Sequence, residues 1–123
     1  MSARSVQVER VDFVAIPSRD AERARAWYRE VLGLEPDWNN PAELTAGQVT
    51  VGFWRPEDEG IEFTPDIGGF AVRVADVGNA KAELEAKGVE FLGQGDTGVC
   101  HMAVCADPDG NAVILHRRYK PYE

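Results

Sequence analysis

Two hydrophobic runs joined by a tight turn dominate the C-terminal part of the chain, from Val99 to Arg117. The turn reads Asp107-Pro108-Asp109-Gly110-Asn111. Proline fixes φ, Asp and Asn tolerate left-handed geometry, and Gly takes positive φ without steric cost. This pattern predicts a β-hairpin.

A turn centred between Pro108 and Asp109 predicts a register for the hairpin. The predicted opposite pairs are Met102 with Leu115, Ala103 with Ile114, Val104 with Val113, and His101 with His116. Because side chains alternate across a strand, one face would carry Met102, Val104, Val113 and Leu115 and pack under helices. The other face would carry His101, Ala103, Cys105, Ala112, Ile114 and His116, like the wall of a cavity. A shift of one residue would separate the two histidines.

The N-terminal half begins with a β-rich segment, Val8 to Ile16, which Pro17 ends. Ser18 or Asp20 is suited to cap the helix that follows. In this helix apolar residues recur at helical spacing until Gly33 stops it, namely Ala24, Trp27, Tyr28, Val31 and Leu32. A loop over 36–41 and two short strands, about 43–46 and 48–54, complete this half.

The same order of elements then starts again after an acidic connector over 56–65. The pattern predicts a strand over 69–74, a helix capped by Asp76 and ended by Gly88, and a strand over 89–92 before a glycine-rich loop. The helix-ending glycines lie 55 residues apart (88 minus 33). We therefore predict one domain over 1–123 with an α+β fold: two tandem β-α-β-β-β modules, about 6–55 and 66–118, whose curved sheets surround a shared cavity.

Composition narrows the expected partners and compartment. A chain of 123 residues can bury roughly two-thirds of its unfolded surface. A net charge of −8 argues against nucleic acid or an anionic membrane surface as partner. The sequence has no apolar stretch of membrane-spanning length and no signal-peptide pattern, so the expectation is a cytoplasmic protein of bacterial type. Cys100 and Cys105 lie five apart on one predicted strand, on opposite faces, and are expected to stay reduced.

Three segments resemble the vicinal oxygen chelate superfamily, which includes glyoxalases, extradiol dioxygenases, epimerases and bleomycin-resistance proteins. They are the helix over 24–34, the strand that ends Val72-Arg73-Val74-Ala75-Asp76, and the turn over 107–111. The resemblance covers nearly the whole chain and implies a shared architecture. It does not by itself imply a reaction, because such a fold hosts many chemistries.

The resemblance also implies where a divalent metal would bind: through a residue on the first strand and another on the last strand of each module. The matching positions are Phe13 and Gly69 on the first strands, Ile114 on the last strand of module two, and Val51 or Gly52 on the last strand of module one. None has the imidazole nitrogen or carboxylate oxygen that such a site needs. We therefore expect no metal and no cofactor, and the case for an enzyme is weakened.

The preferred hypothesis is a metal-free protein that binds or sequesters a small organic molecule, as bleomycin-resistance members of this superfamily do. The expected ligand-binding residues are Phe13, Trp54, Gly69, His101, Ile114 and His116. Apolar walls with few polar anchors suit such a pocket. The acidic excess would favour a cationic ligand by long-range steering, although the cluster over 57–62 is also typical of a solvated linker.

Two alternatives remain at the level of sequence. His101 and His116, if opposed, could build a relocated metal site with Cys105 or Asp107, or act as general acid and base. The chain could instead be an interaction module with a vestigial cavity. The resemblance implies a homodimer, in some members with modules exchanged between subunits, and the tail residues Tyr119, Pro121 and Tyr122 could pack across such an interface.

Overall fold

Two β-α-β-β-β modules follow one another along the chain in the computed structural model, which describes residues 6–122. Module one contains β1 (Phe13–Pro17), α1 (Ala21–Glu30), β2 (Glu35–Pro36), β3 (Leu44–Ala46) and β4 (Val49–Trp54). A short 3-10 turn, η1 (Pro56–Glu59), lies in the connector. Module two contains β5 (Phe70–Arg73), α2 (Val77–Ala86), β6 (Phe91–Asp96), β7 (Cys100–Ala106) and β8 (Ala112–Arg118).

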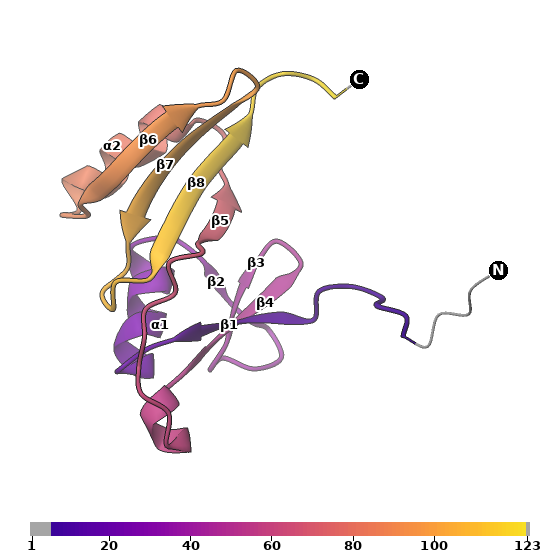
Figure 1. Ribbon diagram of the computed structural model, residues 1–123, viewed down its shortest axis with the longest axis vertical. Helices are drawn as coiled ribbons and strands as arrows, with labels where there is room; N and C mark the ends of the chain where they lie inside the picture. Colours follow the sequence, from indigo (N-terminus) through magenta and orange to yellow (C-terminus); the bar gives the residue numbers. More distant parts are fainter. Residues whose placement is uncertain (1–5, 123) are drawn as a thin grey trace.

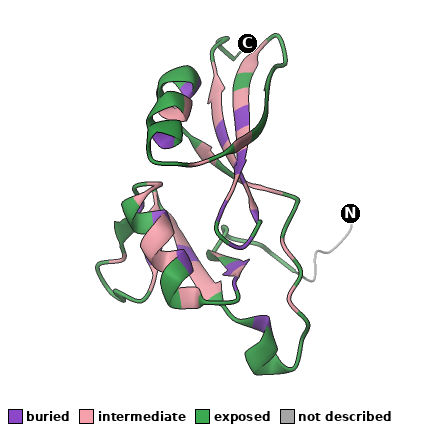
Figure 2. Cartoon of the chain, turned by 90° about the vertical axis from the view of Figure 1, so that its left-hand side faces the viewer, coloured by how far each residue is buried: buried purple, intermediate pink, exposed green. Residues whose placement is uncertain are grey.

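Each module forms its own four-stranded mixed sheet. The strand orders are β1-β4-β3-β2 and β5-β8-β7-β6. In both sheets the first strand runs parallel to the last, and the remaining pairs are antiparallel. The modules lie one above the other with both helices on the same side (Figures 1 and 2). The predicted α+β fold of two tandem modules is thereby confirmed.

The helices begin and end for the predicted local reasons. Asp20 caps α1 by accepting a hydrogen bond from the Arg23 amide, and Asp76 caps α2 in the same way from the Asn79 amide. Gly33 and Gly88, just beyond the two helices, have positive φ. Within the described residues, no helix is both long and apolar enough to cross a membrane.

Two local predictions are corrected. The glycine-rich stretch after residue 92 is part of strand β6, not a loop, because β6 pairs with β7 as far as Asp96. The hairpin register is also shifted by one residue: Met102 lies opposite His116, Ala103 opposite Leu115, and Cys105 opposite Val113. His101 therefore faces Arg117, and the predicted His101–His116 pair is wrong.

The corrected register also changes which side chains share a face. Four buried hairpin residues pack on the helix side, namely Ala103, Cys105, Val113 and Leu115. The opposite face carries Met102, Val104, Ile114 and His116, all of them half-buried. The predicted grouping of Met102 and Val104 with Val113 and Leu115 was therefore wrong, although the alternation within each strand was correct.

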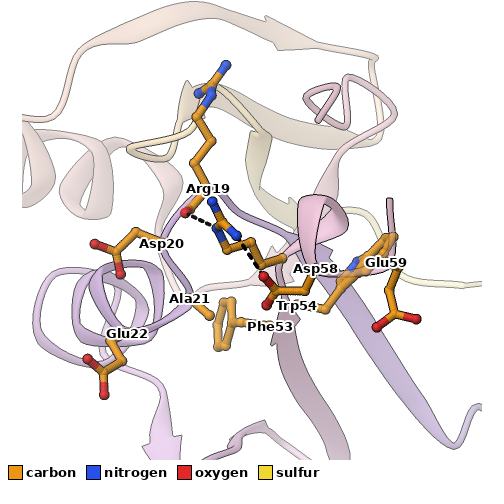
Figure 3. Close-up of a pocket in the computed structure, with 9 residues that line it drawn as sticks. Arg19, Asp20, Ala21, Glu22, Phe53, Trp54, Asp58 and Glu59 are labelled. Atoms are coloured by element: carbon orange, nitrogen blue, oxygen red, sulfur yellow. Dashed lines mark hydrogen bonds and ion pairs between the residues drawn. The ribbon is translucent and has the colours of Figure 1, made fainter. Parts of the chain in front are cut away.

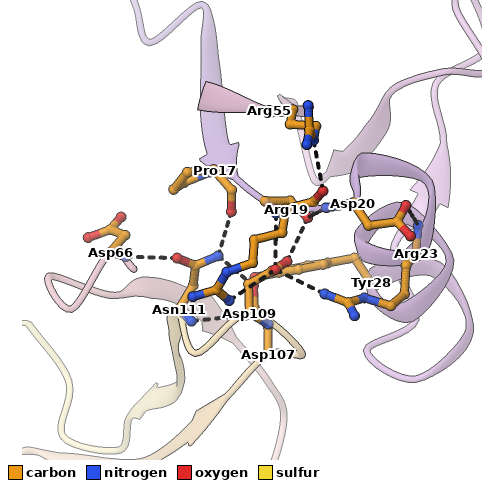
Figure 4. A network of polar contacts seen from close by, with 11 residues as sticks. Pro17, Arg19, Asp20, Arg23, Tyr28, Arg55, Asp66, Asp107, Asp109 and Asn111 are labelled. Atoms are coloured by element: carbon orange, nitrogen blue, oxygen red, sulfur yellow. Dashed lines mark hydrogen bonds and ion pairs between the residues drawn. The ribbon is translucent and has the colours of Figure 1, made fainter. Parts of the chain in front are cut away.

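Hydrogen bonds of the turn over 107–111 connect module two to module one (Figure 4). Asp107, which is buried, accepts hydrogen bonds from the Tyr28 hydroxyl (2.7 Å), from the Asn111 side-chain amide and from the backbone amides of Asp109 and Asn111. The Asn111 amide also donates to the Pro17 carbonyl oxygen at 2.8 Å. A buried carboxylate is costly unless its oxygens are hydrogen-bonded, and the turn itself supplies three of these donors while module one supplies the fourth, the Tyr28 hydroxyl.

A second buried carboxylate in the turn, Asp109, lies at the N-terminus of α1. It accepts a hydrogen bond from the Ser18 hydroxyl (2.6 Å), one from the Arg19 amide (3.1 Å) and one from the Arg23 guanidinium (3.0 Å). The N-terminus of a helix favours negative charge because its amide groups lack partners. The position of Asp109 therefore fixes the end of α1 against the hairpin.

Tyr28 links both modules through its ring as well as its hydroxyl. Its centroid lies 5.0 Å from that of Phe53 in module one and 6.2 Å from that of Phe70 in module two. Burial, followed by the nearby Asp107 charge, raises the pKa of Tyr28 far above its ordinary value. The phenol therefore remains a hydrogen-bond donor at all ordinary pH values.

Replacing Tyr28 with Phe should lower the free energy of unfolding by about 1–3 kcal/mol, because Asp107 would stay buried with one donor fewer. Urea denaturation measures this loss. The matched control is Tyr119→Phe, which removes a hydroxyl that donates to Asp96 at the exposed surface, and should change stability by less than about 0.5 kcal/mol. Equal losses of unfolding free energy in the two variants would contradict a special stabilising role for the hydrogen bond from Tyr28 to Asp107.

Candidate functional site

A cleft of about 780 Å³ separates β1 and the end of α1 from β5. Both modules line it, mainly with aliphatic side chains and the Phe70 ring. The lining includes Val14, Ile16 and Leu34 of module one and Ala71, Val72 and Arg73 of module two. The volume is within the range of small-molecule sites, which are typically apolar with few polar groups. One side of this cleft is the edge of β5, which in the described chain pairs only with β8.

The side of each sheet away from the helices is open. In module one it carries Phe13, which is 58% exposed, and Trp54, which is 37% exposed. In module two, Gly69 immediately precedes β5, and Ile114 lies opposite Ala71 on the same side. Strand alternation also places Gly52, not Val51, on the open side of module one, since Val51 is buried in the core.

The backbone at Gly69 cannot hold a larger residue in this arrangement. Its φ is +96°, and a Cβ atom there would lie 2.6 Å from Cδ1 of Ile114. Glycine is the residue that tolerates both conditions. The Ile114 side chain thus fills the space in which a first-strand side chain of module two would begin.

The open faces do not fit a metal ion of the kind that the resemblance implies. The four corresponding positions, Phe13, Gly52, Gly69 and Ile114, carry no oxygen or nitrogen donor. Among residues 6–122, no three His, Cys, Asp or Glu side chains lie close enough together to hold a metal ion. No step of a metal-dependent reaction can be built on these residues.

The two histidines lie on opposite faces of their sheet. His101, on the helix side, lies 3.4 Å from an Asp96 oxygen and its ring lies 4.4 Å from the Tyr119 ring. Hydrogen bonds from the Gly98 amide and the Tyr119 hydroxyl lower the pKa of Asp96. His116 lies on the open side. The two imidazoles are therefore not opposed, and the pairing on which the relocated site depended is wrong.

Cys105 is buried in the core and its surroundings keep the thiol protonated. Burial, helped by the Asp107 charge, raises the pKa of the Cys105 thiol to about 11. Metal binding and nucleophilic attack both require the thiolate. Cys100 lies on the other face of β7, and neither cysteine is disulfide-bonded.

A wide hollow of about 580 Å³ lies at the N-terminus of α1 (Figure 3). Trp54 and Phe53 contribute its apolar surface, and an ion pair between Arg55 and Asp58 closes one side with an N–O distance of 2.6 Å. Trp54 therefore lies beside the connector, away from the cleft between the modules. Trp38 is 93% exposed and contributes to none of these surfaces.

A third hollow, of about 340 Å³, lies at the far end of the open face of module two. Its lining is rich in basic side chains: Arg73, His116, Arg118 and Lys120 with Tyr119, Pro121 and Tyr122. Sequence reasoning missed this group. The available signal was that Arg73 ends one strand of module two while His116 and Arg118 end another, so that parallel pairing of the two strands brings them together.

The family model of the Glyoxalase/Bleomycin resistance protein/Dioxygenase superfamily matches residues 10–115. The chain belongs to this superfamily. The match runs from the segment before β1 into β8 and so covers most of both modules, including the turn. Among curated proteins, no match is found.

Solved structures of the superfamily share the fold. The chain is similar to a lactoylglutathione lyase from Agrobacterium tumefaciens, with a TM-score of 0.73 and 20% identity over 89% of this chain and 94% of that one. A superfamily member from Sphaerobacter thermophilus gives 0.74 and 22% over 89% and 97%. The antibiotic-binding protein TnmS3 from Streptomyces sp. CB03234 gives 0.70 and 22% over 92% and 98%. At these identities the likeness concerns the fold alone.

The buried thiol predicts a specific loss of stability at alkaline pH. In the unfolded chain Cys105 has its ordinary pKa of 9.0, whereas burial raises the pKa to about 11 in the folded chain. The contribution of Cys105 to the free energy of unfolding is therefore complete below pH 9. It is lost as the pH rises to 11, and the free energy of unfolding falls by about 1.4 kcal/mol per pH unit. Urea unfolding between pH 9 and 11 should give a slope that is about this much shallower in Cys105→Ala than in the wild type and in Cys100→Ala. The raised pKa of Tyr28 adds a further slope above pH 10 that all three proteins share. An unchanged slope in Cys105→Ala would contradict the prediction.

Proposed function

We propose that this protein binds a small organic molecule in a cavity that a second copy of the chain completes, and that it does so without a metal ion. The observation that carries the proposal is the cleft of about 780 Å³, which both modules line with aliphatic side chains. Removal of apolar surface from water would supply most of the affinity. The antibiotic-binding relative with the same fold supports binding as the class of function.

The residues at the positions of the superfamily's metal ligands also support binding. Phe13 and Ile114 present hydrocarbon where a polar site would need donors. Position 69 favours glycine because its φ is positive and because the Ile114 side chain lies where a Cβ atom would be. These features suit the wall of an apolar pocket and give no support to lyase or dioxygenase chemistry at these positions.

The edges of the two sheets support a role for a second copy. In the described residues β1 pairs only with β4, and β5 pairs only with β8. Exposed apolar side chains flank both edges: Val8 before β1 is 84% exposed and Ile67 before β5 is 86% exposed. An unpaired apolar strand edge tends to associate with other chains, and a partner that covers it removes this tendency to aggregate. A second copy that covers β1 and β5 would also close the cleft that lies between them.

The dimer is tested by a charge placed on the exposed β1 surface. Phe13→Asp should convert the protein from twice its chain mass of 13.5 kDa to a single chain at micromolar concentration, because a carboxylate would be buried in the interface. Light scattering after gel filtration measures the mass. The matched control is Leu92→Asp on β6, which is 65% exposed and should leave the dimer intact. A wild-type protein that is monomeric at these concentrations would contradict this part of the proposal.

Ligand binding is tested by filling the cleft from an exposed position. Ala71 lines the cleft, whereas Ala75, also exposed, does not. Saturation-transfer NMR with a panel of neutral and charged aromatic compounds should identify binders whose affinity falls about tenfold or more in Ala71→Phe and stays unchanged in Ala75→Phe. If the dimer persists and no compound binds, the chain is better described as an interaction module with a vestigial cavity.

A further inference from the structure

We propose that the basic hollow at the end of module two's open face binds an oxyanion, such as the carboxylate or phosphate group of a small organic ligand. This inference names the class of ligand for the protein, and the part that concerns the ligand's apolar body depends on the function proposed above. The binding of the anionic group depends only on the residues of the hollow.

The parallel pairing of β5 with β8 brings the cationic side chains to one place. Arg73 lies opposite His116, and Arg118 follows two residues further along β8. Residues two apart on a strand project to the same face about 7 Å apart. Lys120 and the Tyr122 ring close the end of the hollow. An anion there would therefore meet positive groups from two strands and from the tail.

The arginines of the hollow lack the carboxylate partners that most other arginines of the chain have. Within residues 6–122, Arg19, Arg23, Arg29 and Arg55 each lie within 4.0 Å of an acidic oxygen, whereas no such pair involves Arg73, Arg118 or Lys120. The chain has a net charge of −8, yet these three cations gather without an acidic partner among residues 6–122. An exogenous anion would supply the missing charge.

Arg118 also has a hydrogen-bond donor that is buried and unused. Its guanidinium lies over the Tyr122 ring at 4.3 Å, and one Nη atom donates to the Pro121 carbonyl oxygen at 3.4 Å. Its Nε atom is buried with no hydrogen-bond partner among the described residues. A buried donor without a partner is costly, and an arginine matches the oxygens of a carboxylate or phosphate particularly well. Arg118 therefore carries a donor that no described residue satisfies.

The local charge of the hollow differs in sign from that of the whole molecule. The net negative charge led to the expectation of a cationic ligand through long-range steering. Over a few ångströms, however, the nearest charges dominate, because salt screens interactions beyond about 8 Å at physiological ionic strength. Arg73 lines both the hollow and the cleft between the modules. A ligand with an apolar body in the cleft can therefore place an acidic group beside Arg73.

The experiment uses NMR of the arginine Nε–Hε groups in the full chain, with inorganic phosphate as the first probe. Phosphate should shift the Arg73 and Arg118 resonances saturably, and either Arg73→Gln or Arg118→Gln should weaken binding about tenfold or more. Arg117→Gln is the matched control, since it removes the same charge from the neighbouring position on the opposite face of β8. Its phosphate affinity should change less than twofold.

Three results would overturn the inference. Equal weakening in Arg117→Gln would show general charge attraction, and no saturable shift at Arg73 and Arg118 would show that the hollow does not bind anions. If either glutamine variant turned a dimer into monomers, these cations would belong to the interface between copies.

Benzoate and its neutral analogue benzamide separate this test from that of the proposed function. Binding of benzamide in the cleft without phosphate binding refutes only the anion site, whereas phosphate binding without any binding of either aromatic compound refutes only the apolar cavity.

Discussion

The burial of two carboxylates in one five-residue turn is the constraint on which the rest of this structure depends. Asp107 and Asp109 are both nearly inaccessible to solvent. Their oxygens accept hydrogen bonds from the Tyr28 and Ser18 hydroxyls and from the Arg23 guanidinium, all of which belong to module one. Separation of the modules would leave either buried charges without partners or a turn that must unfold to reach water. The two halves of the repeat are therefore expected to unfold together.

This attachment also determines where open surface remains. The hydrogen bonds between the modules are concentrated at the turn over 107–111 and the N-terminal end of α1. Both helices consequently lie on one side, and both helix-free sheet faces are left without cover (Figure 1). β1 and β5 belong to separate sheets and do not pair with each other. The modules also share hydrophobic core, since Tyr28 of module one packs in one cluster with Cys105 and Val113 of module two. The cleft lies beside β1 and β5, where the two sheets do not pair.

Local chemistry predicted most of the fold, whereas side-chain contacts across long sequence distances decided what was missed. The caps Asp20 and Asp76, the two helices and the repeated order of elements follow from spacing and turn residues. The hairpin register did not: the pairs lie one residue away from those predicted, and the turn is held by the Tyr28 hydroxyl and the Pro17 carbonyl oxygen from module one, which the hairpin sequence does not contain. One residue of difference moved His101 away from His116. The candidate positions Phe13, Gly69 and Ile114 were recognised from motifs, but the basic hollow required knowledge that β5 lies beside β8.

The two parallel strand pairs occupy equivalent places in the repeat, yet they end in different chemistry. β1 and β4 finish with Pro17 opposite Trp54, whereas β5 and β8 finish with Arg73 opposite His116. The two modules repeat one order of elements, and these end residues remove the equivalence between them. A molecule with one acidic end would consequently have a single preferred direction within an otherwise symmetrical scaffold.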